Sequence, residues 1–317
     1  MMRYLVGRVP SLVLVLLASS VVAFALPRLA PGDVAAAIAG ADATQVQIDA
    51  IRDQLGLNSP LPAQYWHWIS GLFHGDLGQS YFKHRSVASL IGDRLESTVE
   101  LALVALVLVI LIGMVLGILG GSPRGRWARA VLDMGSSLLI AVPSFLFALA
   151  AILIFGIYHR WLPTGGEVSL LDDPWIGIQY LILPAFALAL APGAVVGRML
   201  QTEMLKMRNE DFVDLALAKG VSPGAITRRH VLRNSLGSAV VGVGLQAGNL
   251  IAGAVVIEAV FSRNGIGQLA VSSVASRDFT VLQVLILGVV TVAALCQILT
   301  EIILAGIDPR VRLGESA

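Results

Sequence analysis

The chain has 317 residues, of which 56% are hydrophobic and only 14% are charged, and its formal net charge is +1. Soluble globular domains carry about 25% charged residues, so this composition excludes an ordinary soluble domain and predicts an integral membrane protein. The nearly neutral charge gives no bulk argument for nucleic acid or an acidic substrate as a partner. The single cysteine, Cys296, lies in an apolar run, which excludes a disulfide framework or a cysteine metal site within the chain.

Six segments are long and apolar enough to cross a bilayer, since a helical span needs about 20 mostly apolar residues. They are residues 9–29, 99–121, 131–157, 176–197, 236–257 and 281–306. The apolar core of the first is about 18 residues long, beyond the roughly 7–15 of a signal peptide, which favours a retained helix over a cleaved leader. Pro143 interrupts the third span, and Pro184 and Pro192 interrupt the fourth. We expect kinks there, which serve either packing or gating.

The distribution of Lys and Arg predicts the orientation of these spans. With the N-terminus inside, 14 of the 22 Lys and Arg residues fall in inner segments and 8 fall in outer ones. The inner residues crowd the ends of the spans in short loops, where the positive-inside rule has most weight. We therefore expect both termini and the polar block at residues 201–233 to be cytoplasmic.

The outer segment, residues 31–96, is the longest soluble stretch. A capped helix start at Asp42 opens one amphipathic run, which Gly56 ends, and a second run carries Tyr65 and Trp68. Because Tyr and Trp favour the membrane interface, the segment is expected to be an interfacial cap, a lid that receives a binding protein, or both. The expected division is residues 1–30 for an N-terminal transmembrane helix, 31–96 for the extracytoplasmic segment, and 97–317 for the transmembrane core.

The apolar segments lack the residues that a membrane enzyme needs. All histidines lie outside the spans: His67, His74, His84, His159 and His230. The serines of Gly135-Ser136-Ser137 therefore have no intramembrane histidine for nucleophilic catalysis. No G-x-x-x-x-G-K-[ST] phosphate-binding loop is present, so any ATP and Mg²⁺ would be bound by a partner. We expect a non-catalytic protein without a cofactor or metal of its own.

Two amides mark the fifth span. Gln246 and Asn249 are three residues apart, hence on one helix face, and Gly242, Gly244 and Gly248 surround them. They form either inter-helix hydrogen bonds or a polar wall of a translocation path. The ionisable residues near the spans lie within a turn or two of their ends, which argues against an ion-coupled carrier: Glu100, Asp133, Glu258 and Glu301.

The block at residues 201–233 is the most informative stretch, because it is too polar for the bilayer and separates two apolar runs. Ala216 and Gly220 are four residues apart, so we place them on one helix face that a partner approaches closely. Ser222-Pro223 then breaks the helix. A basic-flanked helix-turn-helix between two spans is a segment by which a soluble partner could grip a membrane channel. Its candidate coupling residues are Asp214, Ala216, Ala218, Lys219, Gly220, Ser222, Arg228 and Arg229.

Ordered motifs along the chain carry a family resemblance. They include Leu29-Ala30-Pro31-Gly32-Asp33, Gly75-Asp76-Leu77-Gly78, Ala141-Val142-Pro143-Ser144, Asp211-Phe212-Val213, His230-Val231-Leu232-Arg233-Asn234 and Asp308-Pro309-Arg310-Val311-Arg312. Together they resemble the permeases of dipeptide and oligopeptide ABC importers, a group that also includes nickel and glutathione importers. The block resembles the EAA loop of those permeases. Asp214, Ala216, Gly220 and Leu232 match the loop pattern, whereas its first Ala, its Ile and its Pro are replaced here.

The resemblance implies a type I ABC importer permease fold and alternating access. It also implies a second permease, two ATPase subunits that bind ATP and Mg²⁺, an extracytoplasmic substrate-binding protein, and a prokaryotic inner membrane. The alternatives are a self-sufficient secondary carrier or channel, which would require internal repeats and a mid-membrane ion site, or a permease for nickel or glutathione.

Overall fold

The computed structural model describes residues 2–29, 34–39, 43–54, 56–123 and 125–307. The motifs expected at residues 30–33 and 308–312, and the helix cap at Asp42, lie outside the described residues. The chain forms two compact units, which we describe separately. Among the described residues, the first consists of Val99–Arg263 and residues 293–307, and the second of Met2–Thr98 and Asn264–Val292.

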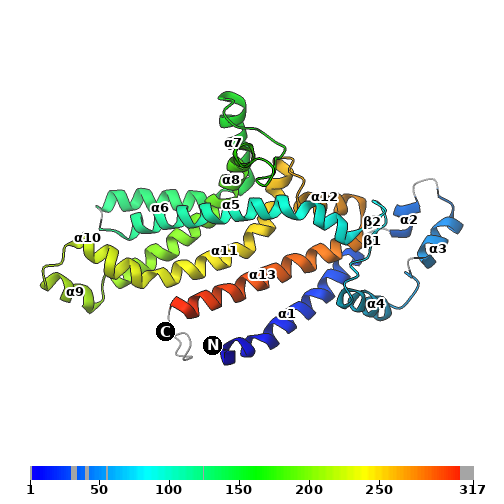
Figure 1. Cartoon of the computed structure of the whole chain (residues 1–317), viewed down its shortest axis with the longest axis horizontal. Coiled ribbons are helices and arrows are strands. Elements are labelled where there is room, and N and C mark those ends of the chain that lie inside the picture. The colour runs from blue at the N-terminus through cyan, green and yellow to red at the C-terminus, as the bar shows by residue number, and fades with distance from the viewer. Residues whose placement is uncertain (1, 30–33, 40–42, 55, 124, 308–317) are drawn as a thin grey trace. The chain divides into compact units, whose positions relative to one another are not determined.

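Within the described ranges the elements are helical apart from one short hairpin, which confirms the expected all-α class (Figure 1). In order they are α1 (Met2–Leu29), α2 (Val34–Ala39), α3 (Gln45–Gln54), α4 (Leu61–Phe73), β1 (Gln79–Ser80), β2 (Arg85–Ser86), α5 (Val87–Gly121), α6 (Arg126–Ala141), α7 (Ser144–Ala151), the π-helix η1 (Ile152–Tyr158), α8 (Pro174–Met207), α9 (Asp211–Ala218), α10 (Pro223–Ile226), the π-helix η2 (Thr227–Val231), α11 (Leu232–Val260), α12 (Ile266–Ser276) and α13 (Phe279–Ile307).

Among the described residues, four helices are long and apolar enough to cross a membrane: Val87–Gly121, Pro174–Met207, Pro223–Val260 and Phe279–Leu304. A bent pair, Trp127–Ala141 with Ser144–Tyr158, makes a fifth if it is one span. The first expected span is helical as α1, but its apolar part, Pro10–Leu26, belongs to the shorter class of 10–17 residues. The expected number of six is therefore not exactly reproduced.

The third expected span turns a corner at Pro143. Val142 has extended backbone, with φ −83° and ψ 125°, which a following proline favours because its ring clashes with a helical residue before it. The flanking helices are bent by 97°. Since α6 has only 16 residues and a helix rises about 1.5 Å per residue, α6 alone is shorter than the roughly 30 Å hydrocarbon core. The expected kink is thus a break, whereas Pro184 and Pro192 remain inside a continuous α8.

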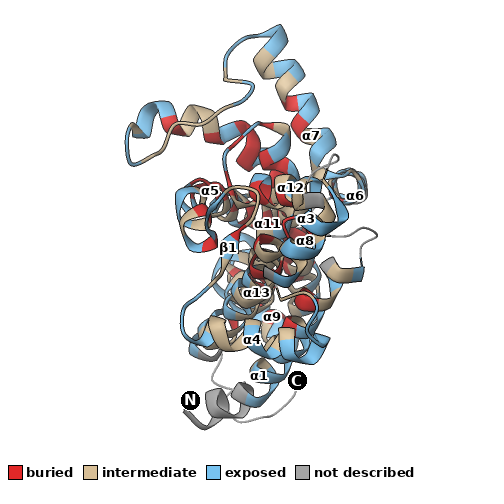
Figure 2. Ribbon diagram, turned by 90° about the vertical axis from the view of Figure 1, so that its right-hand side faces the viewer, coloured by how far each residue is buried: buried red, intermediate tan, exposed pale blue. Residues whose placement is uncertain are grey.

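The first unit is built around α8. In its apolar window 61% of the residues are buried, against 22–28% in the other three long helices. It packs against α11, α6 and α7. The buried residues, red in Figure 2, include Leu181, Leu188, Leu200 and Met204 of α8. The outer surfaces of the other spans keep large exposed apolar side chains, as lipid-facing helices do.

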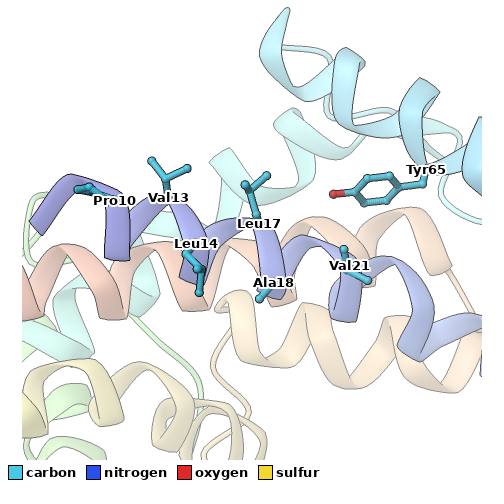
Figure 3. A pocket seen from close by; sticks show the side chains of 7 residues that line it. All are labelled: Pro10, Val13, Leu14, Leu17, Ala18, Val21 and Tyr65. Carbon is cyan, nitrogen blue, oxygen red and sulfur yellow. The ribbon is translucent and has the colours of Figure 1, made fainter.

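The second unit joins α1 to α4 through aromatic side chains. The Phe24 and Tyr65 rings meet edge to face at 5.4 Å, and Trp68 lies 5.9 Å from Phe24. Tyr65 directs its hydroxyl at α1, beside an open apolar groove lined mainly by α1 residues (Figure 3), and its oxygen lies 2.7 Å from Ser20 Oγ. The segment around Tyr65 is therefore helical, as expected, and this helix, α4, packs on α1.

Candidate functional site

The block at residues 201–233 is a helix, a turn and a second helix, as expected. The helix α8 continues through the first seven residues, and α9 follows with Asp211 and Asp214 in its first turn, where negative charge favours the helix dipole. Gly220 ends α9 with φ +75°, a left-handed conformation that glycine adopts without strain. The Val221 amide closes this cap by donating to the Ala216 carbonyl at 3.1 Å. The chain then enters α10 and η2, which lead directly into α11.

Most of the candidate coupling residues are on the surface. The exposed ones are Asp214, Ala218, Lys219, Gly220, Ser222, Arg228 and Arg229. The structure adds two residues that the sequence analysis did not single out. Leu215 and Leu217 of α9 are 56% and 50% exposed, on a segment too polar for lipid. The signal that could have revealed them is the spacing of Val213 and Ala216, which takes the buried face and leaves the leucines outside.

Ala216 differs from the expectation. It is buried, and it belongs to the same apolar cluster as Val213, Ile226 and Val231 of this chain. It does not share a helix face with Gly220, because α9 ends at Ala218 and Gly220 lies in the turn beyond. A partner that contacts this segment therefore meets Gly220 and the exposed leucines, whereas Ala216 holds α9 to the rest of its own unit.

Arg208 ties the block to the spanning helices. It lies just past the end of α8, and its Nε donates to the carbonyl of Gly121, the last residue of α5, at 2.7 Å. Its Nη2 donates to Thr227 Oγ1, also at 2.7 Å. Burial lowers the pKa of Arg208, and the positive charge of Arg129 lowers it further. The side chain was not among the expected site residues, because nothing local in the sequence pairs position 208 with position 121.

The amides expected to line a path lie together on α11. Asn249 Nδ2 donates to Gln246 Oε1 at 3.5 Å, and Gln246 is half-buried while Asn249 is exposed. The neighbouring glycines serve packing. A Cβ on Gly242 would lie 3.0 Å from the sulfur of Met199 of α8, and one on Gly244 would overlap Thr300 of α13. The glycines therefore let α11 pack closely against α8 and α13. Gln246 and Asn249 instead offer amide groups for hydrogen bonding.

A buried charge cluster lies where α11 ends. Arg263 is 1% exposed and contacts two carboxylates, Glu167 at 3.6 Å and Glu100 at 3.9 Å. Glu100 also accepts from the Leu170 amide at 2.7 Å and from Ser169 Oγ at 3.0 Å. Burial lowers the pKa of Arg263, and the carboxylates of Glu167, Glu100 and Glu258 oppose that effect. In the part of the chain that the structure describes, no group of three His, Cys, Asp or Glu side chains could hold a metal ion.

The fold is that of an ABC transporter permease. It matches a chain of the MetNI methionine ABC transporter in an inward-facing conformation with a TM-score of 0.58, over 69% of this chain and 96% of that one. Another crystal form of that transporter gives a TM-score of 0.57, over 70% and 97%. The sequence identity is 16% in both, so these matches establish the fold alone.

The chain belongs to the binding-protein-dependent transport system inner membrane components, whose family model matches residues 93–313. The N-terminal model of such components matches residues 1–102. Family membership confirms the resemblance drawn from the ordered motifs, and it replaces the alternative of a self-sufficient carrier or channel. It defines the chain as a transport permease subunit of the membrane.

Relatives match over 98% of this chain and 99% of their own length. A putative peptide transport system permease protein of Brucella abortus (strain 2308) is 36% identical over 314 residues. A probable peptide ABC transporter permease protein of Sinorhizobium fredii is 34% identical over 311 residues. The glutathione transport system permease protein GsiC of Escherichia coli (strain K12) is 35% identical over 312 residues.

Proposed function

We propose that this chain is the membrane-spanning permease subunit of an ATP-driven importer of short peptides, and that it forms the translocation path with a second permease. The observation that carries the substrate class is the 36% identity, over 98% of the chain, to a protein named a peptide transport permease. The path opens alternately to the two sides of the membrane as two ATPase subunits bind and hydrolyse ATP with Mg²⁺. This chain contributes no catalytic residue and no cofactor.

Glutathione is the second candidate substrate. The identity to GsiC, 35% over 312 residues, is close to that of the peptide permeases. Glutathione is itself a tripeptide, so the two candidates belong to one chemical class.

The exposed surface of α9 is the proposed contact with an ATPase subunit. Leu215 and Leu217 are the proposed apolar anchors, and the exposed charged residues Asp214 and Lys219 flank them along the chain. An apolar centre with a polar rim is the usual composition of a protein interface. Gly220 lies open beside them, since a Cβ there would meet nothing within 4 Å. With the inner ends of the spans rich in Lys and Arg, this surface and both termini face the cytoplasm.

The amides of α11 are the proposed polar contribution to the path. Gln246 and Asn249 offer donors and acceptors that suit the amide groups of a peptide backbone. An extracytoplasmic binding protein would deliver the peptide to the opposite end of the helices, where the segment 31–96 is placed by the orientation above.

The test is transport by the reconstituted complex. The chain would be purified with the second permease and the two ATPases of the proposed complex, placed in proteoliposomes, and supplied with the binding protein. We expect uptake of labelled dipeptides, oligopeptides or glutathione that requires ATP, together with ATP hydrolysis stimulated by the loaded binding protein. ATP-independent uptake, or binding of nucleotide at micromolar affinity by this chain alone, would contradict the proposal.

A further inference from the structure

Arg208 joins three segments through one planar group. It follows the last residue of α8, contacts the last residue of α5 through Nε, and contacts the first residue of η2 through Nη2. The Thr227 hydroxyl in turn donates to the carbonyl of Pro223, the first residue of α10, at 2.9 Å, so Arg208 is also linked to α10. Because the guanidinium is rigid, its two hydrogen bonds set the distance between Gly121 and Thr227.

The two spanning helices that meet at Arg208 are interlocked by glycines. A Cβ added to these glycines would lie 2.6–2.8 Å from a side chain of the other helix, too close for any real contact. The pairs are Gly113 of α5 with Val196, Gly117 with Leu200 and Gly121 with Met204, and Gly193 of α8 with Ile112 and Gly197 with Leu116. Since side chains of each helix fill the notches of the other, we expect α8 and the C-terminal part of α5 to move together.

We call α9, α10 and η2, residues 211–231, the coupling segment. The covalent chain by itself gives only a loose connection between the coupling segment and the α5–α8 pair. Between α8 and α9 lie only Arg208, Asn209 and Glu210, in a turn. On its other side the coupling segment runs without a break through η2 into α11. A push on α9 would therefore reach α11 directly, and it would reach the α5–α8 pair by three routes: the packing of α11 on α8, the apolar contacts of α9, and Arg208. Of these, Arg208 alone joins the end of α5 to η2 through directed hydrogen bonds.

A cation at this place also fits the end of α5. The last carbonyls of a helix carry partial negative charge and have no partner within the helix. Arg208 supplies both a donor and a positive charge to one of them. Arginine keeps its charge at neutral pH even where burial disfavours the charged form, so protonation does not switch this connection off.

We propose that Arg208 is a positioning residue for energy coupling, which transmits displacement of the α9–η2 segment to the α5–α8 pair. The proposal rests on the proposed function, because it requires ATPase subunits that move this segment. Without the guanidinium, the ATPases would still bind α9 and hydrolyse ATP, but less of each displacement of α9 would reach the α5–α8 pair. The expected defect is lost coupling, with assembly retained.

The experiment compares ATP hydrolysed per peptide imported in the reconstituted complex. Arg208→Ala should raise this ratio at least about fivefold, the lower end of typical coupling effects. Thr227→Val removes only one hydroxyl and should raise it in the same direction. Because the two residues act through one connection, the double variant should be no worse than Arg208→Ala. Arg208→Lys keeps the charge without the rigid fork, so it should restore the ratio only partly.

The matched control is Arg198→Ala. Arg198 is an exposed arginine within α8, and its Nη2 donates to Ser137 Oγ at 2.6 Å and to the Asp133 carbonyl at 3.4 Å, both in α6 and away from the coupling segment. Its loss should leave the ratio unchanged. In a Cys296→Ala background, Arg208→Cys with Thr227→Cys should lose coupling and regain it when a bismaleimide about as long as an arginine side chain bridges the thiols. A purely structural role for Arg208 would not give this rescue.

Normal coupling in an assembled Arg208→Ala or Thr227→Val complex would overturn the proposal, as would an equal loss in Arg198→Ala. An additive double variant would overturn it too, because the residues would then act independently. Absence of ATP-driven uptake in the unmodified complex would instead overturn the proposed function, and this inference with it.

Discussion

Ser80 donates its hydroxyl to the carboxylate of Asp278, 198 residues further along the chain, and both side chains are 1% exposed. The contact lies within the second unit and holds the β1–β2 hairpin against the turn between α12 and α13. Gly78 makes the approach possible, because a Cβ there would lie 2.8 Å from a methyl group of Thr280. Lys83 of the same hairpin donates to Ser272 Oγ at 3.5 Å.

The first prediction is that protonation of Asp278 strengthens this attachment. Burial raises the pKa of Asp278 above its ordinary value of 3.8, although hydrogen bonds from Ser80 and Val281 and the charge of Lys83 oppose the shift. Because the pKa of Asp278 is higher in the folded state than in the unfolded state, protonation of Asp278 stabilises the folded state. This stabilisation is complete at pH values below the pKa of the unfolded state, and it disappears as the pH rises through the pKa of the folded state. Hydrogen exchange at residues 79–86, corrected for its intrinsic pH dependence, should therefore show less opening at acidic pH than at neutral pH.

Asp278→Asn should remove that dependence, because the amide is neutral throughout and keeps an oxygen that can accept from Ser80. The exposed Asp172 supplies the control: Asp172→Asn should leave the pH dependence as it is. An unchanged pH profile in Asp278→Asn would show that another group titrates.

The second prediction concerns orientation. In a Cys296→Ala background, a membrane-impermeant thiol reagent should label Ser222→Cys only after lysis, and Leu171→Cys in intact cells. Leu171 is a suitable outer position because it is 83% exposed. Gly165 in the same segment is less suitable, since a side chain there would begin 3.0 Å from the Phe261 carbonyl oxygen. The reversed labelling pattern would rule out a cytoplasmic coupling segment.

The third prediction tests the interlocked α5–α8 pair. Gly117→Leu places a side chain where even a Cβ would lie 2.7 Å from Leu200, so the helices must separate or the side chain must leave its rotamer. Overpacking of this kind typically costs about 1–3 kcal/mol. We expect a lower thermal midpoint and a broader elution profile in detergent. Gly92→Leu is the matched control on the same helix, because a Cβ there meets nothing within 4 Å; a midpoint lowered equally would exclude the notch as the cause.

The sequence was sufficient to predict the helical membrane class. Long apolar runs indicate segments that lie in lipid, and in lipid a single segment satisfies its backbone hydrogen bonds by forming a helix. It predicted α9 and the Gly220 turn from polar composition and turn residues. It did not predict the corner at Pro143, since proline allows either a kink or a break and tertiary packing decides between them. It placed Ala216 on the wrong face, because a short helix outside the bilayer can bury small residues in its own unit. The Arg208 connection spans 87 residues and leaves no local pattern.

The last prediction separates docking of the ATPase from folding of this chain, using neighbouring residues of α9. Leu215→Gln and Leu217→Gln change exposed side chains, so the permease should fold and reach the membrane at normal levels. If these leucines are the anchors, the double variant should lose the ATPase subunits on purification, or retain ATP hydrolysis that no longer responds to the binding protein. Truncating an interface anchor typically costs about 2 kcal/mol or more, which is at least about a thirtyfold loss of affinity.

Ala216→Asp should behave differently, because it buries a charge inside this chain's own apolar cluster. It should lower the amount and thermal stability of the permease itself, with or without its partners. Gly220 is a poor probe of docking, since at φ +75° any side chain strains the turn. Leu171→Gln changes an exposed leucine in the segment between η1 and α8, on the expected outer side, and it should leave both folding and association normal. If the Leu215 and Leu217 double variant keeps a full complement of ATPases and normal uptake, α9 is not the docking surface.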